Sequence, residues 1–262
     1  MSVFAGLESI NGLIVGGNRG IGLGFVRHLL QPDFTDPFQV SVAHLYVTYR
    51  TEVSAELAAI AAVYPDRLTL IQMDITDEAQ IAQGIAQIQR QVSRLHFVLY
   101  CVGFLHENGI QPEKSLQQIQ AEHLIRYFQV NSIGAVLLAK QVLPLIKHGD
   151  RSVFASISAK VGSIGDNRLG GWYGYRASKA ALNMLMRTTA IEYSRKSPKT
   201  LVVMLHPGTT DTGLSKPFQR NVLPEKLFSV EKTVAQLLNV IARLQPEDSG
   251  QFFSWDGSRL PW

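Results

Sequence analysis

The chain has 262 residues, of which 46% are hydrophobic and 18% are charged. That composition supplies a sizeable core and excludes an intrinsically disordered protein, and the length suits one large α/β domain spanning residues 1–262. The formal net charge of +4 is mild, and no dense run of lysines and arginines is present, so we expect no nucleic acid partner.

The N-terminal and cysteine patterns bear on location. Residues 1–10 lack the basic start of a signal peptide, and we see no apolar run of membrane-spanning length, so we expect no membrane partner. The single cysteine, Cys101, excludes an internal disulfide and fits a reducing compartment. These features together predict a cytoplasmic protein.

A glycine-rich turn follows the first apolar run at residues 12–15 and precedes a helical pattern. This order of strand, turn and helix is the context of a dinucleotide-binding fingerprint. Gly16 allows the turn to close, Gly20 allows backbone to approach a pyrophosphate, and Gly22 allows the helix to pack closely on the strand. The alternative is an ordinary tight turn. The cofactor contacts expected here are Gly16, Asn18, Arg19, Gly20, Ile21 and Gly22.

The next segment indicates which nicotinamide cofactor is bound. Residues 31–43 contain prolines and aspartates and predict a surface loop of unreadable function, followed by a strand at 44–49. An acidic residue at the end of this strand would bind the ribose 2′-hydroxyl of NAD. Arg50 stands there instead, with Arg19 as a second cation, which favours the 2′-phosphate of NADP(H). The alternative is that Arg50 is merely solvated.

A helix at 52–63, a strand at 68–73, a helix at 76–91 and a strand at 97–101 follow. Asp74 either accepts the adenine amino group or forms a turn before Thr76, which we expect to be the N-cap of the next helix. Cys101 and Gly103 come at the end of the last of these strands, at the expected cofactor edge. Cys101 fits a small buried residue better than a nucleophile.

Residues 116–147 are predicted to be mostly helical and contain Asn131 and Gly134. Each of these residue types costs roughly 0.5–1 kcal/mol inside a helix, and functional sites are where such local penalties are expected. Asn131 either holds a bent helix and a water molecule beside Lys179 or marks a plain kink.

The long helix that begins near residue 172 carries Tyr175 and Lys179, four residues apart. This spacing places both side chains on one face, one turn apart. A phenol with a pKa of about 10 transfers protons poorly at neutral pH unless its anion is stabilised. A neighbouring ammonium and a nicotinium ring would both stabilise it, so we predict that this pair is the centre of a nicotinamide site.

The remaining pattern completes the predicted fold. Strands are expected at 152–158, 201–205 and 252–255, and a helix at 229–244 with Ser229 as N-cap. Short apolar strands alternating with amphipathic helices predict a Rossmann-type, doubly wound, mostly parallel seven-stranded sheet with helices on both faces.

The sequence resembles the short-chain dehydrogenase/reductase family over essentially its whole length. The matching motifs are Gly16, Gly20 and Gly22, the Asn-x-x-Gly element at Asn131, the Tyr-x-x-x-Lys pair, and Pro207-Gly208. The stretches 161–167, 170–173, 253–257 and 260–262 are similar to the C-factor and sniffer-like carbonyl reductase branch.

The resemblance implies hydride transfer between NADP(H) and a carbonyl or alcohol. Tyr175 would be the general acid in reduction, Lys179 would lower the pKa of Tyr175 and hold the nicotinamide ribose, and Asn131 would anchor a proton-relay water. A serine would polarise the carbonyl. The contacts implied near the nicotinamide carboxamide or the phosphates are Pro207, Gly208, Thr209 and Thr212, with residues 213–229 as a substrate lid.

Two positions depart from the family pattern. The family usually has two serines at the end of the fifth strand, the second being catalytic, whereas this chain has Ser158 and then Ala159. We assign the role to Ser158, which strand alternation turns to the opposite side unless the strand end twists, with Ser163 as the substitute. At 100–103 the chain has Tyr-Cys-Val-Gly where the family commonly has Asn-Asn-Ala-Gly, which removes polar groups that brace the central strand.

Two functions remain open at this point. The first is an NADP(H)-dependent carbonyl reductase or alcohol dehydrogenase acting on a small, apolar substrate and needing no metal. The second is an NADP(H)-binding signalling or interaction protein with little turnover, an alternative that Ala159 sustains. The residues expected to line an apolar pocket are Trp172, Tyr173, Leu214, Pro217, Phe218 and Leu223. By analogy with the family, a homodimer or homotetramer would form through the helices at 116–147 and 172–196, although monomeric relatives exist.

Overall fold

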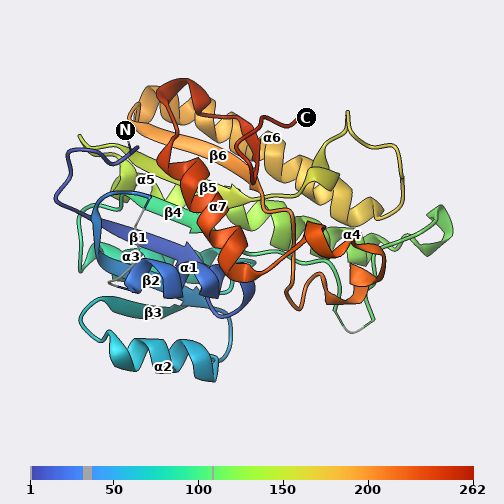
Figure 1. Ribbon diagram of the computed structural model, residues 1–262, viewed down its shortest axis with the longest axis horizontal. Coiled ribbons are helices and arrows are strands. Elements are labelled where there is room, and N and C mark those ends of the chain that lie inside the picture. Colours follow the sequence, from blue (N-terminus) through green and yellow to red (C-terminus); the bar gives the residue numbers. More distant parts are fainter. Residues whose placement is uncertain (1, 32–36, 108) are drawn as a thin grey trace.

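A parallel sheet forms the centre of the molecule in the computed structural model, which describes residues 2–31, 37–107 and 109–262 (Figure 1). Its strand order is β3-β2-β1-β4-β5-β6-β9, and every neighbouring pair is parallel. The predicted Rossmann-type, seven-stranded fold is therefore confirmed. The strands are β1 Ser9–Val15, β2 Ser41–Tyr49, β3 Leu68–Gln72, β4 Phe97–Tyr100, β5 Ser152–Ile157, β6 Thr200–His206 and β9 Phe252–Ser254.

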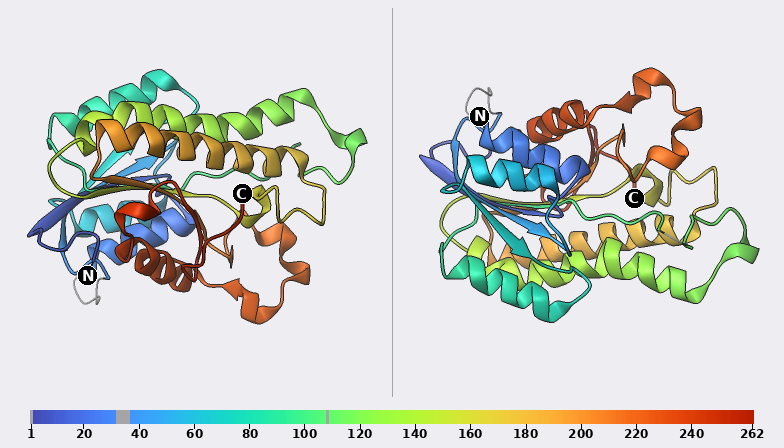
Figure 2. Two further views of the ribbon diagram at one scale, coloured as in Figure 1. Left: turned by 90° about the horizontal axis from the view of Figure 1, so that it is seen from above. Right: turned by 90° about the horizontal axis from the view of Figure 1, so that it is seen from below.

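Helices cover both faces of the sheet (Figure 2). One layer contains α1 Gly20–Leu30, α2 Ala55–Val63 and α7 Val230–Ala242, and the other contains α3 Glu78–Gln89, α5 Gly134–Ile146 and α6 Tyr173–Lys196. Because successive strand residues point to opposite faces, each strand feeds both cores. On β4, for example, Phe97 and Leu99 pack under α1 and α7, whereas Val98 and Tyr100 pack under α5 and α6.

Beyond the carboxyl ends of the strands, the chain between β6 and α7 forms a small separate unit. Strands β7 Thr209–Thr210 and β8 Leu227–Phe228 pair with each other, and the segment between them contains short 3₁₀ turns at Lys216–Asn221 and Pro224–Lys226. This unit corresponds to the segment that the sequence predicts as a substrate lid, and in Figure 2 it lies on the side of the molecule opposite α4 Ala121–Phe128.

The loop predicted at 31–43 is shorter than expected, because β2 begins at Ser41 rather than at residue 44. Ser41 pairs with Ser9 of β1, and Val42 is buried, so the sheet extends to these residues. Phe38 is fully buried and its ring packs edge-on against Phe4, with centroids 4.9 Å apart. Residues 32–36 lie outside the described part of the chain.

Two helix caps were predicted, and one of them is wrong. Helix α3 begins at Glu78, and its N-cap is Asp77, whose Oδ1 accepts hydrogen bonds from the backbone N–H groups of the second and third helical residues at 2.9 and 3.2 Å. Thr76 instead donates from its hydroxyl to Asp74. Ser229 is the N-cap of α7, as predicted, and accepts a hydrogen bond from Lys232 N–H.

The segment predicted as mostly helical at 116–147 is divided into pieces. A 3₁₀ turn at Leu116–Gln118 precedes α4, a π-helical turn at Gln129–Ile133 follows, and α5 completes the segment. The continuous helical stretch Ala121–Ile146 is long and apolar enough to cross a membrane, contrary to the expectation that no run reaches that length. However, 56% of its most apolar window is buried inside the fold, as in the core helix of a globular protein.

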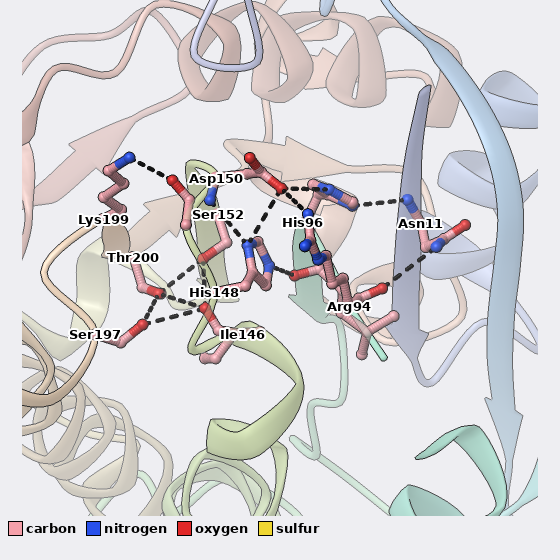
Figure 3. A network of polar contacts seen from close by, with 12 residues as sticks. Asn11, Arg94, His96, Ile146, His148, Asp150, Ser152, Ser197, Lys199 and Thr200 are labelled. Carbon is pink, nitrogen blue, oxygen red and sulfur yellow. Dashed lines mark hydrogen bonds and ion pairs between the residues drawn. The ribbon is translucent and has the colours of Figure 1, made fainter. Parts of the chain in front are cut away.

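A polar network lies at the opposite end of the sheet, where the strands begin (Figure 3). The Oδ2 atom of Asp150 is 2.8 Å from Nη1 of Arg94, 3.9 Å from Nε2 of His96 and 3.8 Å from Nδ1 of His148. His96 Nδ1 accepts a hydrogen bond from the Asn11 N–H at 3.1 Å. The network therefore ties the starts of β1, β4 and β5 together, far from the lid.

Candidate active site

Tyr175 and Lys179 lie on the buried face of α6, one turn apart, as their spacing predicts. Their side chains are 7% and 2% exposed. The Nζ atom of Lys179 is 6.0 Å from the centroid of the Tyr175 ring and donates a hydrogen bond to the carbonyl of Ile157, the last residue of β5, at 2.9 Å. The end of the fifth strand therefore fixes the amine beneath the phenol.

The protonation of the pair follows from its burial. Burial lowers the pKa of Lys179 to about 8, an effect that the nearby Cys101 opposes. Burial also raises the pKa of Tyr175, so the phenol is held in its protonated form. That is the form a general acid needs, although lysine was expected to lower the pKa of Tyr175. Burial dominates because a phenolate loses its hydration when it enters an apolar cluster.

Asn131 lies in the π-helical turn and is fully buried. Its Oδ1 accepts from the Phe104 N–H at 2.7 Å, and its Nδ2 donates to the Phe104 carbonyl at 2.8 Å and to the Ser178 hydroxyl at 3.0 Å. The wide turn confirms that the helix departs from α geometry at Asn131, and π turns occur frequently at functional sites. Asn131 thereby joins the loop after β4 to the residue preceding Lys179. Its water-anchoring role stays a prediction.

The end of β5 separates the two candidate positions for a serine. The Ser158 hydroxyl donates to Asn183 Oδ1 on α6 at 2.7 Å, whereas Ala159 packs in the apolar cluster that contains Tyr175. The Ser163 hydroxyl accepts from the Asp166 N–H at 3.2 Å. Among the described residues, the Ser158 hydroxyl bonds to Asn183 and the Ser163 hydroxyl to Asp166, and neither bonds to Tyr175, so the catalytic role of Ser158 stays a prediction.

The glycine turn has the shape that a phosphate group needs. Gly16 adopts φ +83°, and a Cβ on Gly22 would lie 2.2 Å from the Gly16 carbonyl oxygen, so both positions require glycine. A Cβ on Gly20 would lie 3.4 Å from the Thr212 methyl. The glycine turn and Thr212, the predicted phosphate contact, therefore face each other and form a cradle for a phosphate group. Ile21 is the second residue of α1, which begins at Gly20 in the same turn.

Asn18 holds the glycine turn to the start of α2. Its Nδ2 donates to the Glu52 carbonyl at 2.9 Å, and its Oδ1 accepts from the Ser54 N–H at 2.7 Å. Arg50 lies at the end of β2, and its Nη2 is 3.9 Å from Glu107 Oε1. The Arg50 side chain is half-exposed, so it remains accessible to an anion. Arg19 occupies the N-cap position of α1.

The other predicted cofactor residues lie at the same edge of the sheet. Asp74 Oδ1 accepts from both the backbone N–H and the hydroxyl of Thr76, which is the turn role that its sequence position left open. The adenine role stays a prediction.

The backbone that follows β4 lies close to the amine of Lys179, because a Cβ on Gly103 would be 3.9 Å from Lys179 Nζ. Burial raises the pKa of Cys101, which argues against a thiolate nucleophile. Pro207, Gly208 and Thr209 follow β6, with Gly208 at φ +74°.

An apolar cluster surrounds the phenol and includes part of the predicted lid. Trp172 lies 6.1 Å from Tyr175 and 5.0 Å from Phe218, measured between ring centroids. The lid is held from the other side by His106, whose Nε2 is 3.2 Å from the carbonyl oxygens of Gly213 and Leu214. The cluster also contains Phe104, Leu105, Tyr127, Val130, Ala159, Val161, Ile110 and Leu214.

Two residues of this region have no counterpart in the sequence prediction. His106 contacts Gly213 of the lid although the two residues are 107 positions apart in the sequence. Glu113 bonds to the first turn of α6, 61 positions further along the chain. Neither belongs to a motif, and no periodic pattern singles them out. Only the fold brings them to the site.

Together these features define a class of protein: a Rossmann-type dinucleotide-binding oxidoreductase with a buried Tyr–Lys pair at the carboxyl ends of its strands. The sequence profile described as short chain dehydrogenase matches residues 11–222. Because that match covers more than half of the chain, the chain belongs to the short-chain dehydrogenase family.

Similar proteins agree with this classification. C-signal of Myxococcus xanthus is 32% identical over 148 residues, which cover 56% of this chain and 84% of that protein. The NADPH-bound carbonyl reductase from chicken fatty liver has a TM-score of 0.84 at 27% identity, covering 98% of this chain and 100% of that one. Carbonyl reductase Sniffer of D. melanogaster has a TM-score of 0.83 at 25% identity, covering 97% and 100%. The likeness to C-factor and sniffer-type proteins is thus confirmed.

Proposed function

We propose that this oxidoreductase is an NADP(H)-dependent carbonyl reductase that acts on a small, apolar substrate. The observation that carries the proposal is the phenol of Tyr175, buried in an apolar cluster with the Lys179 amine 6.0 Å from its ring centroid. The NADPH of the chicken carbonyl reductase supports the choice of cofactor, as does Arg50 at the end of β2.

The residues present fit this cofactor. The cradle between Gly20 and Thr212 suits a pyrophosphate, and the N-terminus of α1 supplies unpaired N–H groups and a favourable dipole. The half-exposed guanidinium of Arg50 would bind a 2′-phosphate. When bound, NADP(H) supplies or accepts the hydride.

The chain itself supplies the proton and the environment. Tyr175 donates the phenolic proton to the oxygen of the reduced carbonyl, and the amine of Lys179 stabilises the phenolate that remains. The carbonyl of Ile157 holds this amine in place, and Asn131 holds the backbone beside it through Phe104 and Ser178. The apolar residues of the cluster exclude water, which strengthens these electrostatic effects.

A second function is favoured by one specific observation. Ala159 lies in the Tyr175 cluster at the position where the family usually carries its catalytic serine, and Ser158 is bonded to Asn183. An NADP(H)-binding protein with signalling output and little turnover would tolerate this change. The intact Tyr–Lys pair favours the enzyme, because a binding protein has no need of the phenol.

Replacing Tyr175 by phenylalanine tests the proposal. Phenylalanine keeps the ring and its packing but has no proton to donate, so NADPH oxidation with aromatic aldehydes and diketones should fall by about 100-fold or more. NADPH affinity, measured by the fluorescence of the bound cofactor, should stay nearly unchanged. Tyr64→Phe, at the far end of α2, is the matched control. Retained turnover in Tyr175→Phe would remove this residue as the acid, and absent turnover in the unchanged protein would favour the second function.

We also propose that two copies associate through α4, α5 and α6, which run side by side (Figure 2). Large apolar side chains are exposed on this surface, namely Ile125 at 57%, Ile133 at 42%, Met184 at 67% and Ile191 at 45%. Met184 and Ile191 are seven residues apart and share one face of α6. A second copy that covers these side chains would remove them from water.

A further inference from the structure

Glu113 is a buried carboxylate that the proposed reaction does not use. Its residue is 1% exposed, and its Oε2 accepts a hydrogen bond from the Gly174 N–H, in the first turn of α6, at 3.1 Å. Its Oε1 is buried and has no hydrogen-bond partner among the described residues. A buried carboxylate with half of its acceptors unused is costly, so a compensating interaction is required.

The first turn of α6 supplies that interaction. This helix is 24 residues long, so its unpaired N–H groups present a substantial positive end to the carboxylate. The hydroxyl of the neighbouring Tyr127 donates elsewhere, to the Leu105 carbonyl at 2.7 Å. Glu113 and Tyr127 both border Gly174, because a Cβ added there would lie 3.0 Å from Glu113 Oε1 and 2.4 Å from Tyr127 Cδ2.

The backbone of Glu113 holds a second, strained residue. Trp172 adopts φ +53° and ψ 44°, the left-handed conformation that a bulky side chain rarely occupies, and it follows two glycines that are also left-handed. The Trp172 N–H donates to the Glu113 carbonyl at 2.5 Å. On the other side, Arg176 Nε donates to the Gly171 carbonyl at 3.0 Å. The turn is therefore fixed from both sides.

This strained turn decides where the Trp172 indole lies. The ring meets Tyr175 and Phe218 edge-on, so it joins the catalytic phenol to the predicted lid. In an unstrained backbone conformation, the Cα–Cβ bond of Trp172 would point elsewhere and the indole would leave this place.

We propose that Glu113 is a positioning residue, which uses its carboxylate and its carbonyl together to hold the first turn of α6 and the Trp172 indole against Tyr175 and Phe218. It acts through Gly174 and Trp172 and does not itself touch the reacting atoms. The kinetic part of this inference rests on the proposed reductase function. The structural part does not, because the position of an indole is measurable without turnover.

The kinetic test compares Glu113→Gln with Glu113→Ala. Glutamine retains an acceptor for the Gly174 N–H, so kcat/KM for an aromatic diketone should stay within about threefold of the unchanged protein. Alanine has no acceptor, so kcat/KM should fall by about tenfold or more, while the Kd for NADPH stays within about twofold. Glu122→Gln and Glu122→Ala, on the exposed side of α4, are the matched controls.

A parallel loss in the glutamine and alanine variants would overturn the proposal, and so would kcat/KM retained in alanine. Should Glu113→Ala fail to fold, Glu113→Asp replaces it, because aspartate keeps the charge but is too short to reach Gly174. The proposal then requires glutamine to be active and aspartate impaired. An active aspartate variant beside an impaired glutamine variant would overturn the proposal, because it would show that the charge of residue 113 matters and its length does not.

A spectroscopic test needs no turnover. The chain has three tryptophans, so the contribution of Trp172 to the near-ultraviolet circular dichroism is obtained by subtracting the spectrum of the Trp172→Phe variant in each Glu113 background. The Trp172 signal should persist in Glu113→Gln and disappear in the alanine or aspartate variant. An unchanged signal in both would overturn the proposal even if the protein proves to have no reductase activity.

Discussion

The direction of one hydroxyl at the end of β5 bears directly on how a carbonyl would be polarised. Ser158 donates to Asn183, whereas the methyl group of Ala159 packs against the apolar cluster that contains Tyr175. A hydroxyl at that position would hydrogen-bond the oxygen on which negative charge develops during reduction.

We therefore expect Ala159→Ser to raise kcat for an aromatic aldehyde by about tenfold, because it restores one donor at the reacting oxygen. Ser158→Ala should mainly destabilise the fold, by about 1–3 kcal/mol, since the buried Asn183 Oδ1 loses its donor. Steady-state kinetics and urea unfolding of the two variants separate these effects. A loss of kcat by more than about 100-fold in Ser158→Ala, without a gain in Ala159→Ser, would instead assign the role to Ser158.

Arg50 should decide between the two nicotinamide cofactors. Replacing Arg50 by aspartate removes the cation expected at the 2′-phosphate and adds a carboxylate that repels it, so preference should shift toward NADH by about 10- to 100-fold. The ratio of kcat/KM for NADPH to that for NADH measures the shift, with Arg90→Asp, at the exposed end of α3, as the charge-matched control. Equal use of both cofactors by the unchanged protein would contradict the phosphate role.

At the scale of helices, α4, α5 and α6 carry the proposed self-association. A charged side chain in the centre of an apolar interface is strongly unfavourable, because it loses its hydration without gaining a partner. We expect Met184→Arg and Ile191→Arg to convert a dimer into a species of 29.0 kDa, as measured by light scattering during gel filtration. Val63→Arg, on α2 across the sheet, alters an equally exposed apolar residue and should leave the mass unchanged. A 29.0 kDa species for the unchanged protein would refute the dimer.

The elements that the sequence predicts well are those specified by neighbouring residues. The glycine turn, the Ser229 cap and the spacing of Tyr175 and Lys179 are all set within a few positions, so these local features could be predicted from the sequence. The orientation of Ser158 depends on how the end of β5 meets α6, and Glu113 meets Gly174 across 61 positions. Such contacts follow from the tertiary fold, which explains why the sequence did not predict the hydrogen-bond partner of either residue.

At the scale of the whole molecule, the network at the starts of the strands makes stability depend on pH. Burial lowers the pKa of His96 to about 4, and His148 and Arg94 lower it further, whereas Asp150 raises it. The geometry agrees, because Nδ1 of His96 accepts from the Asn11 N–H and so carries no proton. His206 lies outside this network, at the end of β6, and burial lowers its pKa to about 4 as well.

A histidine with a lowered folded-state pKa stabilises the fold in its neutral form. Above its unfolded-state pKa of 6.5 the contribution is complete, and it is lost as the pH falls from there toward 4, because the unfolded chain binds the proton first. Each such histidine changes the free energy of unfolding by up to about 1.4 kcal/mol per pH unit. Urea unfolding should therefore show marked destabilisation between about pH 7 and about pH 5.

His96→Asn isolates the contribution of this network. The asparagine Oδ1 can accept from the Asn11 N–H as Nδ1 of histidine does, but it does not titrate. The free energy of unfolding of the variant should therefore fall less between about pH 7 and about pH 5 than that of the unchanged protein. The difference should be up to about 1.4 kcal/mol per pH unit, which corresponds to one proton. His123→Asn, on α4 outside the network, is the control. If His96→Asn and the unchanged protein lose equal stability over this range, the acid sensitivity originates elsewhere, and the partly buried His206 becomes the next residue to replace.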